Sequence, residues 1–102
     1  MLVVLTTVTH IHEAETLAEK IVESKLAACV QILPPMTSVY VWEGKLQKES
    51  EHLLIIKTLE EKYADLEAFI TANHRYDVPE IVAIEAANVS DAYSAWLGQS
   101  LN

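Results

Sequence analysis

Residues 38–58 read "SVYVWEGKLQKESEHLLIIKT", and this stretch decides the fold. Alternating β-branched and aromatic residues lead into Glu43-Gly44, the only glycine-bearing turn in the first half of the chain. The second arm ends in the apolar run 53–58, which is typical of a buried strand. The pattern therefore predicts a β-hairpin, and a hairpin of this length overhangs the core of a 102-residue chain.

The residues before the hairpin predict a strand, a helix and a second strand. Residues 2–8, "LVVLTTV", form an apolar β-type run, and Thr9 is placed to cap a helix after it. Residues 27–33, "AACVQIL", predict the next strand, and Pro34-Pro35 then impose a bulge or bend, because proline cannot donate to a sheet. The helix has its apolar positions at helical spacing, namely Ala14, Leu17, Ala18, Ile21, Val22 and Leu26.

The residues after the hairpin predict a helix, a strand and a final helix. Thr58 and Glu61 have the spacing of a capping box, and the helix behind them ends near His74. Residues 81–87, "IVAIEAA", predict the fourth main strand, and Ser90 caps the last helix. The inward positions of the two helices are Tyr63, Leu66, Phe69 and Ile70 in the first, and Tyr93, Trp96, Leu97 and Leu101 in the second.

This order predicts a single α+β domain over residues 1–102. A β-α-β-β-α-β order with two helices on one face of an antiparallel sheet is the ferredoxin-like, split β-α-β arrangement, here with a long central hairpin and a C-terminal helix. Right-handed crossovers place 2–8 and 53–58 in the middle of the sheet and the other two strands at its edges. The loop after the first strand, the tip at 42–45 and the loop 74–80 then share one end.

Composition narrows the partners and the compartment. Fifteen acidic and seven basic residues give a net charge of −8, which disfavours nucleic acid and anionic membranes. Hydrophobic residues make up 51% of the chain, so some apolar surface is expected to meet a partner. The start "MLVVLTTVTH" has no basic leader, and Cys29 is the only cysteine, which suits a reducing compartment. We therefore expect a soluble, cytoplasmic protein.

The stretch 74–80, "HRYDVPE", carries the most unusual chemistry. His74 is a candidate ligand for a metal or an anion, and the alternative is that it caps the last carbonyls of its helix. His10 and His12 could complete a metal site with it, or they are simply solvated. Cys29, at the other end of the sheet, is expected to be a small buried hydrophobe rather than a ligand.

Two further groups of residues are candidates for an interface or a cleft. Tyr40 and Trp42 alternate along the hairpin and share one face, which favours a subunit interface or ligand pocket over ordinary core. Lys57, Tyr76 and Glu80 could line a cleft, or each could form a surface pair.

Enzymatic classes lack the parts they need, and no catalytic residue is predicted. The single cysteine has no base assigned beside it, and two glycines cannot build a phosphate-binding loop. A metallochaperone would need a C-x-x-C motif, which a chain with one cysteine lacks. An RNA-binding module would need a basic face with exposed aromatic residues on its central strands, and these are also absent.

Four stretches together resemble the CutA family of divalent-cation tolerance proteins: "KLAACVQI" (25–32), residues 38–58, "HRYDVPE" (74–80) and "YSAWL" (93–97). The resemblance implies a ferredoxin-like subunit, a tight homotrimer, a cytoplasmic location and a link to copper and other divalent ions. The copper site proposed for the family falls on Thr6, Asn73 and His74. Only His74 is a good ligand for a soft metal, so the sequence predicts weak copper binding and no required cofactor.

Two functions remain open from the sequence. The first is a non-enzymatic homotrimer that serves divalent-metal tolerance. The alternative is a structural or signalling hub, similar in architecture to the PII-type proteins, that binds a small ligand or a partner protein in clefts between its subunits.

Overall fold

One long strand, β4 (Lys45–Thr58), organises the sheet in the computed structural model, which describes all of residues 1–102. Its second half pairs with β1 (Leu2–Val8) on one side and β2 (Cys29–Ile32) on the other. Its first half pairs with β3 (Met36–Trp42), and β5 (Val82–Glu85) lies at the far edge beside β1. The order β2-β4-β1-β5, with all pairs antiparallel, confirms the predicted ferredoxin-like α+β fold and its central strands.

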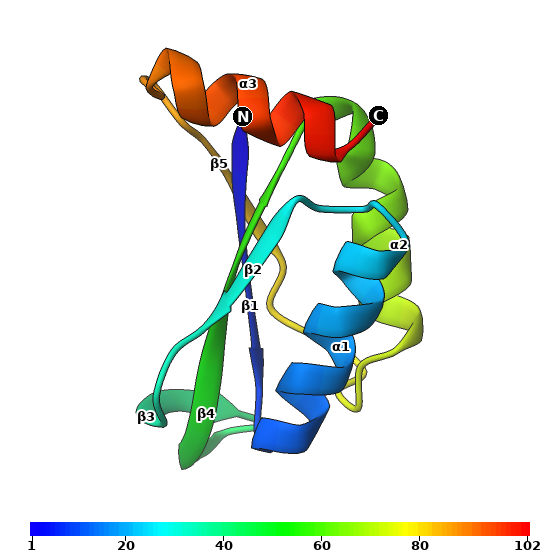
Figure 1. The fold of residues 1–102 in the computed structure, drawn as a ribbon. Helices are drawn as coiled ribbons and strands as arrows, with labels where there is room; N and C mark the ends of the chain where they lie inside the picture. Colours follow the sequence, from blue (N-terminus) through cyan, green and yellow to red (C-terminus); the bar gives the residue numbers. More distant parts are fainter.

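The helices lie where this topology requires. Figure 1 shows α1 (Ile11–Glu23) and α2 (Tyr63–Ala72) together on one side of the sheet, with α3 (Asp91–Ser100) across the end that holds the N-terminus. A short 3₁₀ turn, η1 (Glu60–Lys62), precedes α2. No helix combines the length and the apolar character needed to span a membrane.

The hairpin turn explains how β4 can be so long. Trp42 pairs with Lys45, so Glu43 and Gly44 form a two-residue loop, with φ angles of 51° and 78°. Two positive φ values in a two-residue loop are the type I′ geometry, whose twist matches that of the flanking strands. The predicted break at Pro34-Pro35 is also confirmed, because β2 ends at Ile32 and β3 begins at Met36.

The core lies between the sheet and the two helices. Alternate residues of the central strands, Val4, Leu54 and Ile56, have no exposed surface, and they meet the apolar stripe of α1. Val22 was predicted to belong to this stripe but is 40% exposed, because it lies one residue, and so about 100° around the helix, beyond the fully buried Ile21.

Two predicted helix starts are wrong. The N-cap of α1 is His10 rather than Thr9, and it makes no side-chain cap hydrogen bond. Thr58 does not form a capping box, because its hydroxyl donates to the Leu26 carbonyl at 2.7 Å and the N-cap of η1 is the next residue, Leu59. A buried hydroxyl at a strand end satisfies itself with the nearest free carbonyl, and here that carbonyl belongs to the loop before β2.

The third predicted cap is confirmed, and α1 ends in a way that the sequence did not announce. Ser90 accepts a hydrogen bond from the Tyr93 N–H at 3.3 Å at the start of α3. Beyond α1, Lys25 adopts a φ of 57°, and the N–H groups of Lys25 and Leu26 donate back to Val22 and Ile21. This is the Schellman motif, with a lysine at the left-handed position that glycine usually occupies.

The side of the sheet opposite α1 and α2 has no helical cover except at Lys57, whose Nζ lies 5.5 Å from the centre of the Tyr93 ring of α3. Directly paired residues point to the same side, so Val3 shares a side with Ile84, and Leu5 with Val82 and Ile55. We call this side the open face, and its apolar members are Val3, Leu5, Leu53, Ile55, Val82 and Ile84. Val82 and Ile84 are 46% and 50% exposed, which is high for large apolar residues within a strand.

Candidate functional site

A groove lies between the hairpin and the loop 74–80, at the end of the sheet where the sequence placed its candidates. Its volume is about 690 Å³, which is within the usual range for small-molecule sites. Strand β3 contributes one wall and the loop the other, with Thr7 and Glu51 between them. The aromatic and charged lining residues are Tyr40, Trp42, Glu51, Arg75, Tyr76, Asp77 and Glu80.

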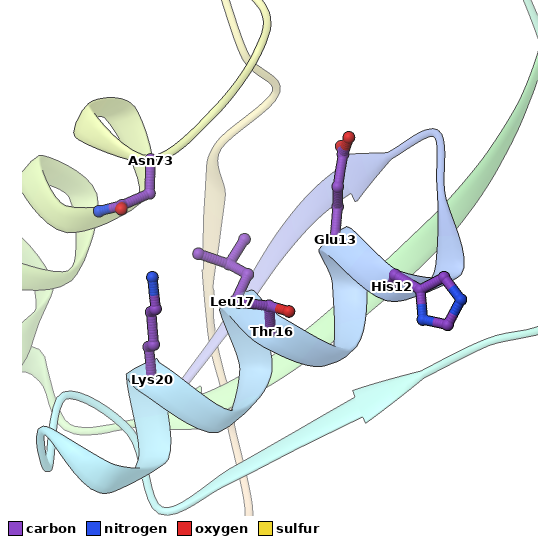
Figure 2. Close-up of a pocket in the computed structure, with 6 residues that line it drawn as sticks. All are labelled: His12, Glu13, Thr16, Leu17, Lys20 and Asn73. Atoms are coloured by element: carbon purple, nitrogen blue, oxygen red, sulfur yellow. The ribbon is translucent and has the colours of Figure 1, made fainter.

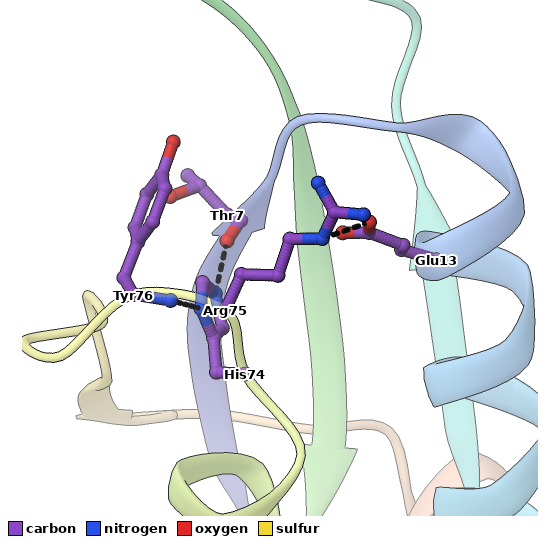
Figure 3. Close-up of polar contacts among 5 residues, drawn as sticks. All are labelled: Thr7, Glu13, His74, Arg75 and Tyr76. Carbon is purple, nitrogen blue, oxygen red and sulfur yellow. Dashed lines mark hydrogen bonds and ion pairs between the residues drawn. The ribbon is translucent and has the colours of Figure 1, made fainter.

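His74 fixes the loop to the sheet through both of its ring nitrogens. Its Nε2 lies 2.7 Å from the Thr7 carbonyl oxygen, and its Nδ1 lies 3.0 Å from the backbone nitrogen of Tyr76 (Figure 3). A carbonyl can only accept and a backbone N–H can only donate, so the proton sits on Nε2 and the imidazole is neutral. The His74 ring thus links strand β1 to the loop 74–80, to which His74 belongs.

This geometry corrects the interpretation of His74 as a helix cap and restricts its interpretation as a metal ligand. His74 was read as a possible cap for the helix carbonyls, but the C-cap is Asn73, whose Nδ2 donates to the Phe69 carbonyl at 2.8 Å. A metal ion could reach either nitrogen of His74 only by displacing one of its hydrogen bonds.

The other residues of the expected copper site do not complete it. Thr6 is fully buried, and its hydroxyl has no hydrogen-bond partner. His10 and His12 are exposed, and no group of three or more histidine, cysteine or acidic side chains in the chain is arranged to hold a metal ion. The residues present therefore do not form a site with three or more such ligands within one subunit.

Arg75 lines the groove and also ties the loop to α1. Its Nε lies 2.7 Å from a carboxylate oxygen of Glu13 on α1, and Figure 3 shows the guanidinium turned toward that helix. The two side chains are 68% and 32% exposed, so the pair contributes little to stability. Its main effect is on charge, because it directs the one cation of the groove toward Glu13.

Tyr76 and Glu51 close the floor of the groove. The Tyr76 hydroxyl donates to Glu51 Oε2 at 3.2 Å, and the Tyr76 ring lies 5.0 Å from that of His74. Burial, then the charge of Glu51 and its hydrogen bond, then Tyr40 and Glu49 raise the pKa of Tyr76 to about 12. Partial burial, together with Glu49 and Glu51, also raises the pKa of Tyr40. The phenols therefore remain protonated donors at neutral pH.

The structure brings most of the predicted cleft residues together. Tyr40, Trp42, Tyr76 and Glu80 all line the groove. Tyr40 and Trp42 are 37% and 50% exposed, so they do not belong to the core of the single chain.

Two other predicted residues differ from expectation. Lys57 does not line the groove, because it is near the opposite end of β4, with its Nζ 5.5 Å from the centre of the Tyr93 ring. Cys29 was expected to be buried but is only partly so, since it begins an edge strand opposite Lys57.

A second, smaller hollow of about 250 Å³ follows the outer side of α1 (Figure 2). Five of its lining residues come from α1 and one, Asn73, from the end of α2. Only Leu17 among them is hydrophobic, and His12 lies at the far end of the row from Asn73 in Figure 2. His74 is not among the residues that line this hollow.

Sequence reasoning missed three residues that shape the groove. Thr7, Glu51 and Arg75 were not singled out in the sequence. In the structure Thr7 and Glu51 are buried, each 5% exposed. Alternation along β4 was the available signal for Glu51, since it places that residue on the same side as Leu53 and Ile55.

The fold and the groove define a small α+β subunit with a ligand-sized groove beside the apolar open face of its sheet. A family model described as CutA1 divalent ion tolerance protein matches residues 2–100. The chain belongs to this family, and the resemblance noted in the sequence is confirmed.

Relatives and solved structures agree with this assignment. The chain is 42% identical over 98 residues to the divalent-cation tolerance protein CutA of Thermus thermophilus, covering 96% of this chain and 95% of that one. It is 48% identical over 99 residues to the chloroplastic CutA of Arabidopsis thaliana, covering 97% of this chain but 54% of the plant protein, so it spans about half that relative's length. The Thermus thermophilus structure superposes with a TM-score of 0.95 at 41% identity, covering all of both chains. The Oryza sativa CutA1 structure gives a TM-score of 0.96 at 44% identity, covering 99% of this chain and 93% of that chain.

Proposed function

We propose that this chain is a non-enzymatic homotrimer that serves tolerance to divalent metal ions. Membership in a family named for divalent ion tolerance supports the biological role. The observation that carries the assembly is the open face, where four large apolar side chains are only partly buried and two more, Val82 and Ile84, are about half exposed.

The physical argument for assembly is the mismatch between strand composition and subunit architecture. When helices cover only one side of a sheet, its strands normally alternate apolar and polar residues, so that the outer side of the sheet is polar. Here β1 is apolar on both sides, and β5 adds Val82 and Ile84 to the open face and leaves one backbone edge unpaired. Exposed edges and apolar patches both favour association, and the partner here is other copies of the same chain.

The number of copies is the finer part of the proposal. Three copies follow from the resemblance described in the sequence, with the long hairpins reaching between neighbours. Light scattering at micromolar concentration should give a mass about three times that of the 11.4 kDa chain. A monomeric mass would contradict the assembly.

Copper binding is proposed as a weak and secondary property. Binding at His74 has to displace a hydrogen bond to Thr7 or Tyr76, and neither Thr6 nor Asn73 supplies a soft ligand. His74→Ala should abolish the weak binding in a copper titration. The double variant Thr6→Cys, Asn73→His should tighten it at least about tenfold, which is about 1.4 kcal/mol. Equal copper affinity in all three proteins would place the site elsewhere.

The groove favours a second candidate function. A hollow of about 690 Å³ with aromatic walls is suited to a small ligand, as expected for a signalling or structural hub. Calorimetry with metal ions and with small molecules separates the two functions, because only the first gives saturable metal binding that is lost with His74.

We also propose a cytoplasmic location. The unpaired Cys29 suits a reducing compartment. Relatives are named chloroplastic in Arabidopsis thaliana and periplasmic in Archaeoglobus fulgidus, so fractionation of the native cells is the appropriate test.

A further inference from the structure

Glu51 is the one acidic residue among the buried side chains, and no cation of its own chain neutralises it. It is 5% exposed, and its Oε2 accepts a hydrogen bond from the neutral hydroxyl of Tyr76. The salt bridge of the chain lies elsewhere, between Arg75 and Glu13. A buried carboxylate without a positive partner is costly, because its charge has lost water and gained no opposite charge. This position is therefore incomplete within one chain.

Glu51 also lies on the side of the sheet that the proposed homotrimer places between copies. Along β4 it alternates in step with Leu53 and Ile55, which belong to the open face. It pairs with Met36 at the base of the β3–β4 hairpin, which leaves the sheet at the end opposite α3 (Figure 1). A neighbouring copy is therefore the partner best placed to supply the missing positive charge.

The chain has seven basic residues that could supply this charge, and five of them are engaged or lie away from the hairpin. Arg75 binds Glu13, and four lysines lie on or beside the helices or near the far end of β4. These four are Lys20 on α1, Lys25 just after α1, Lys57 on β4 and Lys62 on η1. The two that remain, Lys45 and Lys48, both belong to the hairpin part of β4.

The alternation of side chains along a strand selects Lys45 over Lys48. Lys45 points to the same side of β4 as Glu51, whereas Lys48 points to the opposite side. Lys45 is exposed and pairs with Trp42 beside the two-residue turn. The strand between Lys45 and Glu51 spans about 20 Å, so this lysine cannot reach the carboxylate of its own chain. A hairpin that reaches across a neighbour can bring it to the carboxylate of that copy.

We propose that Lys45 of one copy forms an ion pair with Glu51 of the next, so that this carboxylate is neutralised only in the assembled protein. The Tyr76 hydroxyl engages Oε2, and the incoming ammonium group donates to Oε1. Each copy gives one lysine and receives one, which is the head-to-tail contact that closes a cyclic assembly.

The ion pair rests on the proposed homotrimer and adds specificity to it. The apolar open face supplies area but no register, because apolar contact is not directional. A buried charge pair does supply register, since a hairpin shifted along its neighbour would leave Glu51 buried without an opposite charge. The trimer itself needs only the open face, so it stands if the pair does not form.

The test is a double-mutant cycle on assembly, with light scattering over a dilution series in enough urea to dissociate the wild type within that series. Glu51→Gln can still accept from Tyr76, and Lys45→Gln changes an exposed residue, so both should fold, which circular dichroism checks. Each should raise the chain concentration at half-dissociation by at least about tenfold. The double variant should lie within about threefold of the more affected single variant, because both changes remove one interaction.

Lys48→Gln is the matched control, because it removes the same charge from the other side of the same strand. It should leave the half-dissociation concentration within about twofold of the wild type. If the effects of Lys45→Gln and Glu51→Gln multiply in the double variant, or if Lys45→Gln has no more effect than the control, the ion pair is excluded and the trimer stands. A wild type that is monomeric at micromolar concentration without urea would instead exclude the trimer, and the pair with it.

Discussion

The two sides of the sheet are built from neighbouring residues of the same strands, yet only one side is sealed. On β4, Leu54 and Ile56 have no exposed surface beneath the helices. Leu53 and Ile55, which alternate with them, are equally apolar and remain only partly buried on the open face. The difference teaches that a strand that is apolar on both sides needs two covering layers, and this chain supplies one.

The largest expected effect comes from a charge on the open face. Ile84→Asp should reduce the assembled mass to that of the 11.4 kDa chain, because a carboxylate cannot be buried there without a partner. Light scattering measures the mass, and circular dichroism checks the subunit fold. Val22→Asp is the matched control, since Val22 on α1 is 40% exposed against 50% for Ile84. If Ile84→Asp assembles like the control, the open face is not an interface.

Truncations on the two sides of β4 sharpen the same comparison. Ile56→Ala should lower the free energy of unfolding by about 2–5 kcal/mol, because it leaves a cavity in a sealed core. Its effect should be the same in concentrated and dilute samples. Ile55→Ala should cost more on dilution, because it weakens contacts between chains. Urea unfolding at two protein concentrations measures both, and a dilution-independent cost for Ile55→Ala would break the comparison.

A smaller effect on stability is expected from Thr6 and Thr7, adjacent residues of β1 that face opposite sides of the sheet. Thr6 points into the sealed core with an unpaired hydroxyl, so Thr6→Val should raise the free energy of unfolding by about 1 kcal/mol. Thr7 faces the groove, where its hydroxyl is not trapped, and Thr7→Val should change stability by less than about 0.5 kcal/mol. Thermal unfolding of both variants is the measurement, and an equal response would show that the Thr6 hydroxyl carries no penalty.

The smallest effect concerns pH at the margin of the open face. The Tyr76 pKa is raised from 10.0 to about 12 in the folded chain, so its contribution to stability is complete below pH 10 and is lost as pH rises toward 12. Tyr76→Phe should therefore differ most from the wild type below pH 10 and converge with it at higher pH. Urea unfolding across this window measures the difference, and a gap that widens with pH would contradict the sign.

Much of the fold could be predicted because its signals are local. The Glu43-Gly44 turn, the proline break and the Ser90 cap each act within a few residues, and all three are confirmed. The strand order followed from handedness once these elements were placed.

The misses arise where a side chain has distant alternatives. Thr58 has the spacing of a capping residue but bonds to Leu26, which is 32 positions away. Glu51 was not singled out in the sequence, and its 5% exposure goes with a contact from the distant loop 74–80, whose Tyr76 hydroxyl donates to it. His74 was placed at the correct end of the sheet, but its two hydrogen bonds depend on backbone groups that no residue pattern reveals.

The two-residue turn at Glu43-Gly44 also bears on how the chain reaches this structure. Closing the β3–β4 hairpin links near neighbours, whereas pairing β1 with β4 joins Val8 to His52 and Leu2 to Thr58. Hairpins form in about 1–10 μs, while distant pairings must first overcome the entropy of closing a long loop. The hairpin is therefore expected to form first and to present the register of β4 to the rest of the sheet. In pulsed hydrogen exchange during refolding, amides of the hairpin should gain protection before those of β1, and simultaneous protection would point to a single concerted step.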